Sequence, residues 1–252
     1  MRVRLGVIGV AAIAITVLVG GHGVRAEARP PLRVLFVGNS LTATNDLPAV
    51  VAGLTRATGR SLEYRTIAFG GFALEDHWAQ GDARAALASR NWDVVVMQQG
   101  PSALPESQVN LREWASRFAD EARAAGTRPA LLTVWPESYR RGALRDVIAS
   151  YRRAASAARA DLFPAGLAWQ IAWECRPALR LYGPDGFHPS ALGTYAAALV
   201  LFGRLFKAPL VGIRALMPAR VRTRTAVLLQ KAAARSLGRP IRPPCRNGRT
   251  AP

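Results

Sequence analysis

Short apolar runs that alternate with helical patterns constrain this chain more than any other feature. Strands are predicted at 32–37, 62–68, 93–97, 130–135 and 161–164, and helices at 46–58, 74–89, 108–125, 144–160 and 189–206. The run Val94-Val95-Val96 is typical of a strand that is buried on both faces. Strands that alternate with helices form parallel sheets covered on both sides. We therefore expect one doubly wound α/β domain.

The first 26 residues have the pattern of a secretory signal peptide. Arg2 and Arg4 precede an uncharged, mostly apolar run over 5–20, and Val24-Arg25-Ala26 offers a cleavage site after Ala26. An uncleaved membrane anchor is the alternative, although the run is short for a membrane span. In both cases the rest of the chain would lie outside the cytoplasm. We expect an exported protein, periplasmic or extracellular.

The formal net charge is +18, from 34 Lys and Arg against 16 Asp and Glu. Basicity of this size suits nucleic acids, anionic membranes or acidic polymers. However, the cations are scattered, and no RNA-binding or zinc signature accompanies them. We expect a solvated basic surface rather than a functional anion patch, and no nucleic-acid partner.

The pattern changes after residue 210, so 27–210 is expected to be the main domain and 211–252 a basic C-terminal extension. A helix is predicted at 219–237, followed by a tail rich in proline and arginine. This helix either packs on the domain with its basic side in solvent or lies weakly on an anionic membrane or polymer.

Cys175 and Cys245 are the two cysteines of the sequence. An even number in an exported protein permits a disulfide, which would tie the C-terminal tail to the domain. Two free thiols are the alternative. No Cys/His cluster has the spacing of a metal site, and we expect neither a metal nor an organic cofactor.

Two short segments carry the side chains that serine hydrolysis requires. Ser40 follows the first predicted strand within Gly38-Asn39-Ser40-Leu41, and Asp185 precedes His188 by three residues. Serine hydrolysis needs a nucleophile, a base that takes its proton, and an acid that orients the base. In a parallel sheet, sites form at the carboxyl ends of the strands. An ordinary polar turn and a surface loop are the competing interpretations of each segment taken alone.

Taken together, the two segments resemble the serine block and the DxxH block of the SGNH/GDSL hydrolase superfamily. The likeness spans about 32–206, with the blocks in the right order. It implies a three-layer α/β/α fold with a flavodoxin-like parallel sheet, and an enzyme that hydrolyses carboxylic esters. It also implies that Ser40 is the nucleophile, His188 the base and Asp185 the acid that orients it.

The resemblance further implies an oxyanion hole to which the backbone N–H groups of Ser40 and Gly71 donate. The superfamily's third block reads Gly-x-Asn-Asp, and its asparagine side chain also donates. This chain has Gln98-Gln99-Gly100-Pro101-Ser102 instead, and Ser102 takes the asparagine position when counted from the glycine. A glutamine amide has the same NH₂ group on a longer stem, so Gln98 or Gln99 is the expected donor.

Three further residues are expected to line the substrate site. Gly70 precedes Gly71 and is the near alternative to it as an oxyanion donor. His77 lies in the helix after this glycine pair, and Trp135 ends the fourth predicted strand at the same edge of the sheet. Core packing is the competing role for Trp135.

We therefore expect an exported serine esterase that hydrolyses a small acyl ester, with an O-acetylated carbohydrate as one candidate substrate. Hydrolysis of a lipid or lysophospholipid ester is the second substrate class, which the basic tail would suit. A non-catalytic carbohydrate or acyl-group binder of the same fold is the alternative from a different functional class, because the third block is altered.

Overall fold

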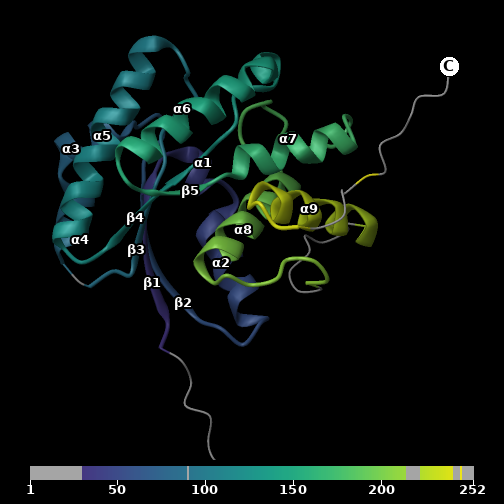
Figure 1. Cartoon of the computed structure of the whole chain (residues 1–252), viewed down its shortest axis with the longest axis horizontal. Helices are drawn as coiled ribbons and strands as arrows, with labels where there is room; N and C mark the ends of the chain where they lie inside the picture. The colour runs from purple at the N-terminus through teal and green to yellow at the C-terminus, as the bar shows by residue number, and fades with distance from the viewer. Residues whose placement is uncertain (1–29, 90, 214–221, 241–244, 246–252) are drawn as a thin grey trace, which may run out of the picture.

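A parallel sheet lies between two layers of helices in the computed structural model, which describes residues 30–89, 91–213, 222–240 and 245 (Figure 1). The strands are β1 (Leu32–Gly38), β2 (Leu62–Ala68), β3 (Val94–Met97), β4 (Arg128–Leu132) and β5 (Asp161–Phe163). They are parallel, in the order β2-β1-β3-β4-β5. This is the flavodoxin-like order, so the predicted three-layer α/β/α fold is confirmed.

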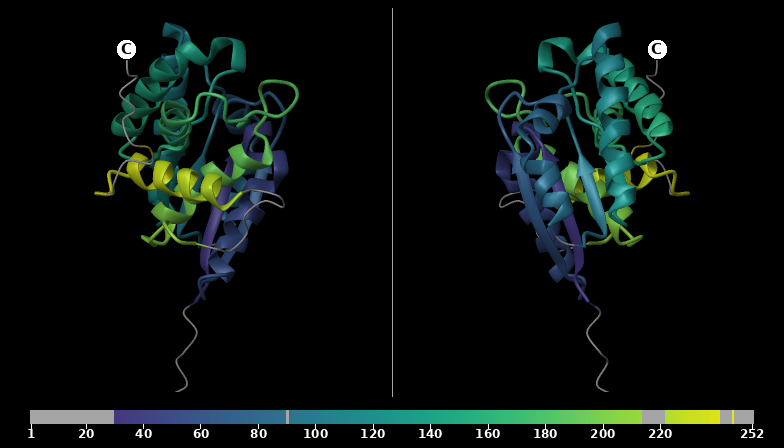
Figure 2. Two further views of the ribbon diagram at one scale, coloured as in Figure 1. Left: turned by 90° about the vertical axis from the view of Figure 1, so that its right-hand side faces the viewer. Right: turned by 90° about the vertical axis from the view of Figure 1, so that its left-hand side faces the viewer.

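The helices form two groups by their contacts. Their bounds are α1 (Ser40–Ala43), α2 (Leu47–Arg56), α3 (Leu74–Gln80), α4 (Asp82–Ala88), α5 (Pro105–Ala124), α6 (Leu144–Ala157), α7 (Ala165–Cys175), α8 (Ala191–Leu205) and α9 (Thr223–Ser236), with 3₁₀ segments η1 (Thr44–Asp46) and η2 (Ser138–Ala143). On one side α3, α4 and α6 contact α5, and on the other α2, α7 and α9 contact α8 (Figures 1 and 2). Both faces of the sheet are therefore covered.

The burial of each strand follows its place in the sheet. Every residue of the central strand β3 is buried, and so are the last five residues of β1. The edge strand β2 instead alternates between partly buried and exposed positions over most of its length. Continuous apolar runs suit central strands of a parallel sheet, whereas alternation suits a strand with one open face.

Several element boundaries differ from the prediction. The strand expected at 130–135 ends at Leu132, because its three-residue neighbour β5 ends at Phe163, which pairs with Leu132. The last helix of the domain begins at Ala191 rather than 189, because the Ser190 side chain accepts a hydrogen bond from the Gly193 N–H at 3.2 Å and caps it. The break expected at Gly81 is present, with φ +89° between α3 and α4. Helices α1 and α7 were not predicted.

The C-terminal helix α9 packs on the main domain. It contacts α7 and α8, and Ala226, Leu229 and Ala233 on its inner side are fully buried in the same hydrophobic core as the sheet. Of the two predicted arrangements for this helix, the structure shows packing on the domain. Within the described residues, no helix has both the length and the hydropathy needed to span a bilayer. The predicted signal peptide, 1–26, lies outside the described residues.

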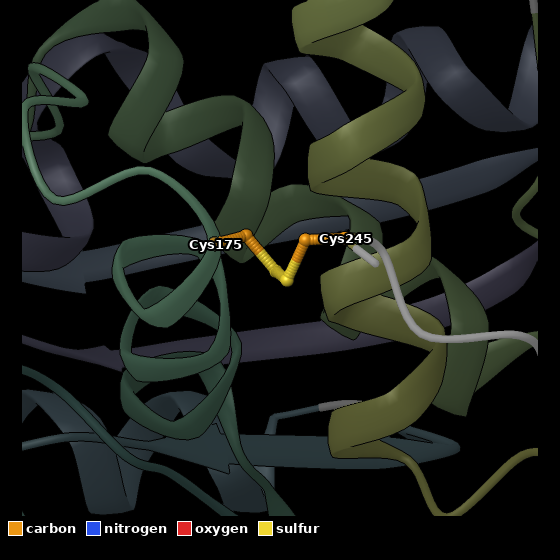
Figure 3. Close-up of a disulfide and its surroundings, with 2 residues drawn as sticks. All are labelled: Cys175 and Cys245. Carbon is orange, nitrogen blue, oxygen red and sulfur yellow. A yellow bond between two sulfur atoms is a disulfide. The ribbon is translucent and has the colours of Figure 1, made fainter. Parts of the chain in front are cut away.

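A disulfide joins Cys175, the last residue of α7, to Cys245 (Figure 3). Their Cα atoms lie 5.3 Å apart, and 70 positions separate them in the sequence. A bridge that closes a loop of this length removes conformational freedom from the unfolded chain. The alternative of two free thiols is thus replaced by a link between α7 and the C-terminal tail.

We expect replacement of both cysteines by serine to lower the free energy of unfolding by about 2–4 kcal/mol. Urea unfolding of the wild type and of the Cys175→Ser/Cys245→Ser variant measures this difference. Reductant should lower the free energy of unfolding of the wild type to that of the variant and leave the stability of the variant unchanged. Equal stability of the oxidised wild type and the variant would contradict the stabilising role.

Candidate active site

The candidate site lies where the order of strands in the sheet reverses. The chain runs from β1 outward to β2 and then returns to β3 on the other side of β1. Loops after the two strands that flank such a reversal diverge, so a crevice opens at their carboxyl ends. Ser40 follows β1 here, and Gln98 and Gln99 follow β3.

Ser40 is the first residue of α1, and Asn39 holds the turn in which it lies. The Asn39 Oδ1 atom accepts a hydrogen bond from the Leu41 N–H at 3.1 Å, and its Nδ2 donates to the Phe72 carbonyl at 3.0 Å. The first N–H groups of a helix have no partner within the helix. Within the described parts of the chain, the Ser40 N–H donates no hydrogen bond, so it can bind a substrate oxygen.

The Gln98 side chain is fully buried and braces this turn. Its Oε1 accepts hydrogen bonds from the Asn39 N–H at 3.0 Å and the Thr42 hydroxyl at 2.8 Å. Its Nε2 donates to the Asn39 Oδ1 at 2.9 Å and to the Gln99 carbonyl at 2.7 Å. An amide has two N–H donors, so none is left for a substrate. We therefore remove Gln98 from the expected oxyanion hole and assign it a supporting role.

Gln99 retains a free donor. Its Oε1 accepts from the Leu74 N–H at 3.2 Å, and its Nε2 approaches the Asn110 Oδ1 at 3.4 Å. The Tyr151 hydroxyl donates to the Gln99 carbonyl at 2.5 Å and fixes the backbone. The second N–H of the Gln99 amide has no partner among the described residues, and the side chain is 6% exposed. It can thus donate to a bound group.

Gln99 and Gly71 line one surface cavity of about 430 Å³. Its other lining residues are Phe72, Ala73, Gly100, Ser102, Glu106, Ser107 and Asn110. Gly71 has φ +78°, a conformation that favours glycine, and both Gly70 and Gly71 are exposed. The structure thus brings together two of the expected oxyanion donors, with Gly70 beside them.

The Asp185 carboxylate holds the His188 ring. Its Oδ2 lies 2.5 Å from the His188 Nδ1, and its Oδ1 accepts from the N–H groups of Phe187 and His188, both at 3.0 Å. The hydrogen bond to the His188 side chain is the main reason that the pKa of Asp185 is lowered, with the Phe187 N–H next. An ionised carboxylate only accepts hydrogen bonds. Nδ1 therefore carries the proton and Nε2 is left as the base.

The loop that carries His188 rests on buried aromatic rings. The Trp135 Nε1 donates to the Phe187 carbonyl at 3.2 Å, and the Trp135 ring stacks on Trp169 at 3.6 Å between centroids. Trp135 is 1% exposed. It was expected to contact substrate, but its ring lies in the core, so we correct its role to support of the loop.

A glycine turn fixes the other side of this loop. Gly186 has φ +71°, and a Cβ atom there would lie 2.6 Å from the Ser138 Oγ. The Ser138 N–H donates to the Gly186 carbonyl at 2.7 Å. Only glycine fits this conformation and this approach without strain, which explains the glycine after Asp185.

Asn45 joins the serine segment to the histidine loop. Its Nδ2 donates to the Pro189 carbonyl at 2.8 Å and to the Thr194 Oγ1 at 2.9 Å. Its backbone has φ +56°, which asparagine tolerates better than most residues. No hydrogen bond joins the Ser40 and His188 side chains among the described residues, and such catalytic contacts often tighten only with substrate bound.

His77 lies in the core beneath the loop over 69–73, which contains Gly70 and Gly71 and is called the glycine loop below. It is fully buried, its Nε2 lies 2.7 Å from the Gly38 carbonyl, and its ring packs against Phe69 and Phe72. A substrate cannot reach it, so its expected role in substrate binding is corrected to packing. Burial is the main cause of its lowered pKa, and the hydrogen bond to Gly38 opposes this effect. Among the described residues the Nδ1 atom has no hydrogen-bond partner, as suits a neutral ring with its proton on Nε2.

We expect His77 to make stability depend on pH. A histidine in the unfolded chain gains a proton below about pH 6.5, whereas the buried ring resists it. Its contribution is therefore full above that pH and declines as the pH falls toward the lowered native pKa. Urea unfolding at pH 7.5 and 5.5 should show a smaller loss of stability for His77→Phe than for the wild type. His188→Ala is the control. A decrease in the free energy of unfolding between the two pH values that is as large in His77→Phe as in the wild type would contradict the explanation.

Four supporting residues were not identified from the sequence. Asn39, Asn45, Ser138 and Tyr151 hold the turns around the site. The positions of Asn39 beside Ser40 and of Asn45 in the following turn are weak signals in the sequence, because asparagine favours capping and left-handed conformations. The contacts of Ser138 and Tyr151 depend on the tertiary fold. In the described part of the chain, no group of three His, Cys, Asp or Glu residues is arranged to hold a metal ion.

Comparison with solved structures identifies the fold. An SGNH hydrolase of provisional assignment from Slackia heliotrinireducens is 29% identical, with a TM-score of 0.58 over 69% of this chain and 98% of that one. A DUF4886 family protein from Bacteroides uniformis is 18% identical, with a TM-score of 0.70 over 84% and 96%. An acetyl xylan esterase is 16% identical, with a TM-score of 0.54 over 68% and 98%.

The structural neighbours thus include SGNH/GDSL hydrolases and a lipase/acylhydrolase from Enterococcus faecalis. The five-stranded parallel sheet with flanking helices matches the SGNH hydrolase fold, and the resemblance predicted from the sequence is confirmed. No protein-family profile and no curated protein matches the chain.

Proposed function

We propose that this chain is an exported serine esterase that hydrolyses a small acyl ester, with an O-acetylated carbohydrate as the leading candidate. The observation that carries the proposal is the Asp185–His188 pair, with 2.5 Å between Oδ2 and Nδ1. The pair lies in a loop that Asn45 ties to the segment after Ser40. Fold neighbours that hydrolyse esters support the reaction class.

In the proposed reaction, the His188 Nε2 takes the proton of the Ser40 hydroxyl as the serine oxygen attacks the ester carbonyl. Asp185 remains ionised and stabilises the charged imidazole. The alcohol leaves with the proton from His188, and the acyl group remains on Ser40. Water, deprotonated by His188, then attacks this acyl-enzyme. The bond from the acyl carbon to the Ser40 oxygen breaks, His188 returns its proton to that oxygen, and the acid is released. No step requires a metal or an organic cofactor.

The proposed oxyanion hole has three donors. They are the N–H groups of Ser40 and Gly71 and the free N–H of the Gln99 amide. Gln99 supports this role because its Oε1 is held by the Leu74 N–H, which fixes the amide in one orientation. Preorganised donors stabilise the charge that develops on the carbonyl oxygen. Gln99 would thus replace the asparagine of the superfamily's third block.

The location and the secondary partner are also proposals. Export rests on the signal-like pattern of 1–26, through either a cleaved signal or an uncleaved anchor. Because α9 buries its inner side against α7 and α8, its outer side, with Arg224 and Arg235 exposed, is available for weak contact with an anionic membrane or polymer.

We expect residues 27–252 to hydrolyse p-nitrophenyl acetate and butyrate, and Ser40→Ala and His188→Ala to lower kcat about 1000-fold or more. The physical reason is that neither variant can form the acyl-enzyme by base-assisted attack. Initial rates of p-nitrophenol release measure the effect, and circular dichroism checks that each variant is folded.

A fluorophosphonate probe separates the remaining alternatives. It should label Ser40 in the wild type and not in Ser40→Ala. A folded wild type that neither hydrolyses the esters nor reacts with the probe would reject the esterase and favour the non-catalytic binder. Butyrate and longer esters turned over far faster than acetate would favour the lipid esterase.

The two glutamines should respond differently to substitution by methionine, which has a similar unbranched shape. Gln99→Met should lower kcat about 100-fold through loss of one oxyanion donor. Gln98→Met should instead lower the free energy of unfolding by about 1–3 kcal/mol, because it leaves the Asn39 N–H and the Thr42 hydroxyl buried without a partner. Kinetics and urea unfolding of both variants test this. Unchanged kcat in Gln99→Met would reject the assignment of the donor.

A further inference from the structure

The segments that carry the candidate site residues are rich in acidic side chains. They fall within 38–47, 69–82, 98–111, 133–139 and 181–195, and Arg140, Arg141 and Arg180 lie just beyond these bounds in the same connections. Although the whole chain has 34 Lys and Arg against 16 Asp and Glu, these segments contain no lysine or arginine. Their acidic residues are Asp46, Glu75, Asp76, Asp82, Glu106, Glu137 and Asp185. The site is thus locally acidic in a strongly basic protein.

The cavity of about 430 Å³ beside the proposed oxyanion hole shares this character. Its charged lining residue is Glu106, which is exposed and has no ion pair among the described residues. Glu75 lies beside the cavity, because its Oε2 accepts a hydrogen bond at 2.6 Å from the Nδ2 of Asn110, which lines the cavity. Gln99 is 6% exposed, and the second N–H of its side-chain amide has no partner among the described residues. Polar groups without protein partners and a carboxylate therefore face this space.

Two other surface cavities differ in their charged lining. One of about 660 Å³ contains Arg33, Arg60 and Lys207 together with Glu63 and Asp93.

One of about 400 Å³ contains Arg141 and Arg145 together with Glu174. Among the described residues that line the cavity beside Gln99, none is basic.

Three of the cations on elements that flank the site have polar partners. Arg140 pairs with Glu137 at 3.3 Å on η2. Arg153 on α6 donates to the Gln108 Oε1 at 2.7 Å. Arg84 on α4 pairs with Glu121 at 2.9 Å. None of the three lines the cavity, so Glu106 and Glu75 dominate its local charge.

We propose that this cavity is a subsite for the alcohol part of the substrate, and that it accepts uncharged or positively charged alcohols and rejects anionic ones. The proposal rests on the proposed esterase function. A small acyl group fills only a fraction of about 430 Å³, which leaves this space for the larger alcohol part. Gly71 and Gln99 line the cavity and also form the proposed oxyanion hole, so the alcohol oxygen would lie at its entrance.

Electrostatics explains the discrimination. An anionic group in the cavity would lie near Glu106 without any basic residue to pair with, and like charges in a partly desolvated site repel. A cation would instead be attracted to the same carboxylate. An uncharged alcohol can use the Ser102 and Ser107 hydroxyls. Esters of phosphate-bearing or carboxylate-bearing alcohols are therefore poor substrates.

Three acetates of equal size but different charge test the proposal. They are acetylcholine, its uncharged isostere 3,3-dimethylbutyl acetate, and 2-acetoxyethanesulfonate. Each kcat/KM is divided by the rate constant for the reaction of that ester with free imidazole, which removes differences in intrinsic reactivity. At low ionic strength the cationic ester should exceed the anionic ester about tenfold, with the uncharged ester between them, and 0.5 M salt should shrink the ratio. If turnover is slow, the Ki of each ester against p-nitrophenyl acetate gives the same ratio.

Glu106→Gln should reduce the cation-to-anion ratio about threefold. Glu113→Gln is the matched control, because it makes the same charge change on α5 at a residue that pairs with Arg117 at 2.9 Å. It should leave the ratio unchanged. Equal or anion-favouring ratios, with p-nitrophenyl acetate still hydrolysed, would overturn the subsite. Failure to hydrolyse any ester would instead reject the esterase function itself.

Discussion

The buried amide of Gln98 is the interaction on which the geometry of the site depends. It makes four hydrogen bonds, which connect the end of β3 to the turn after β1. Through Asn39 it also fixes the glycine loop, because the Asn39 side chain bonds to the Phe72 carbonyl. A Cβ atom at Gly38 would lie 2.6 Å from the Gln98 Oε1, so glycine is required there. The nucleophile turn and one wall of the cavity thus have one common support.

The loop that carries His188 is stabilised by other interactions than the turn that carries Ser40. It lies on stacked tryptophans rather than on an amide network, and Asp185 satisfies the loop's own N–H groups as well as the His188 ring. Asn45 connects the two segments through the Pro189 carbonyl. Under the proposed function, the contact between Ser40 and His188 would form across this link when substrate binds.

The sequence was sufficient to predict the fold but not the roles of several site residues. The bounds of β2 agree with the prediction, because apolar periodicity and flanking glycines report local structure. Helix α7 was missed because alanine and tryptophan bury most of it against other helices, so that Gln170 and Glu174 alone form its polar side, too few to reveal a period. His77 lies in the helix that follows β2 and its two glycines, and Trp135 lies just beyond β4, both near the edge of the sheet where substrates bind. Their burial, however, depends on tertiary packing. Gln98 and Gln99 are neighbours in sequence, and only their hydrogen-bond partners distinguish them.

The distribution of charge allows the whole molecule to attract anions while the candidate site does not. A net charge of +18 attracts anionic polymers and surfaces to the molecule as a whole. If the site shared this charge, anionic groups would also compete with substrate for the oxyanion donors, which bind any oxyanion. Under the proposal, Glu106 in the cavity and Glu75 beside it would repel such groups. The described basic face of α9 lies in the other helical layer. Under the proposed function, attachment to an anionic surface and turnover of an uncharged or cationic ester would therefore proceed without interference.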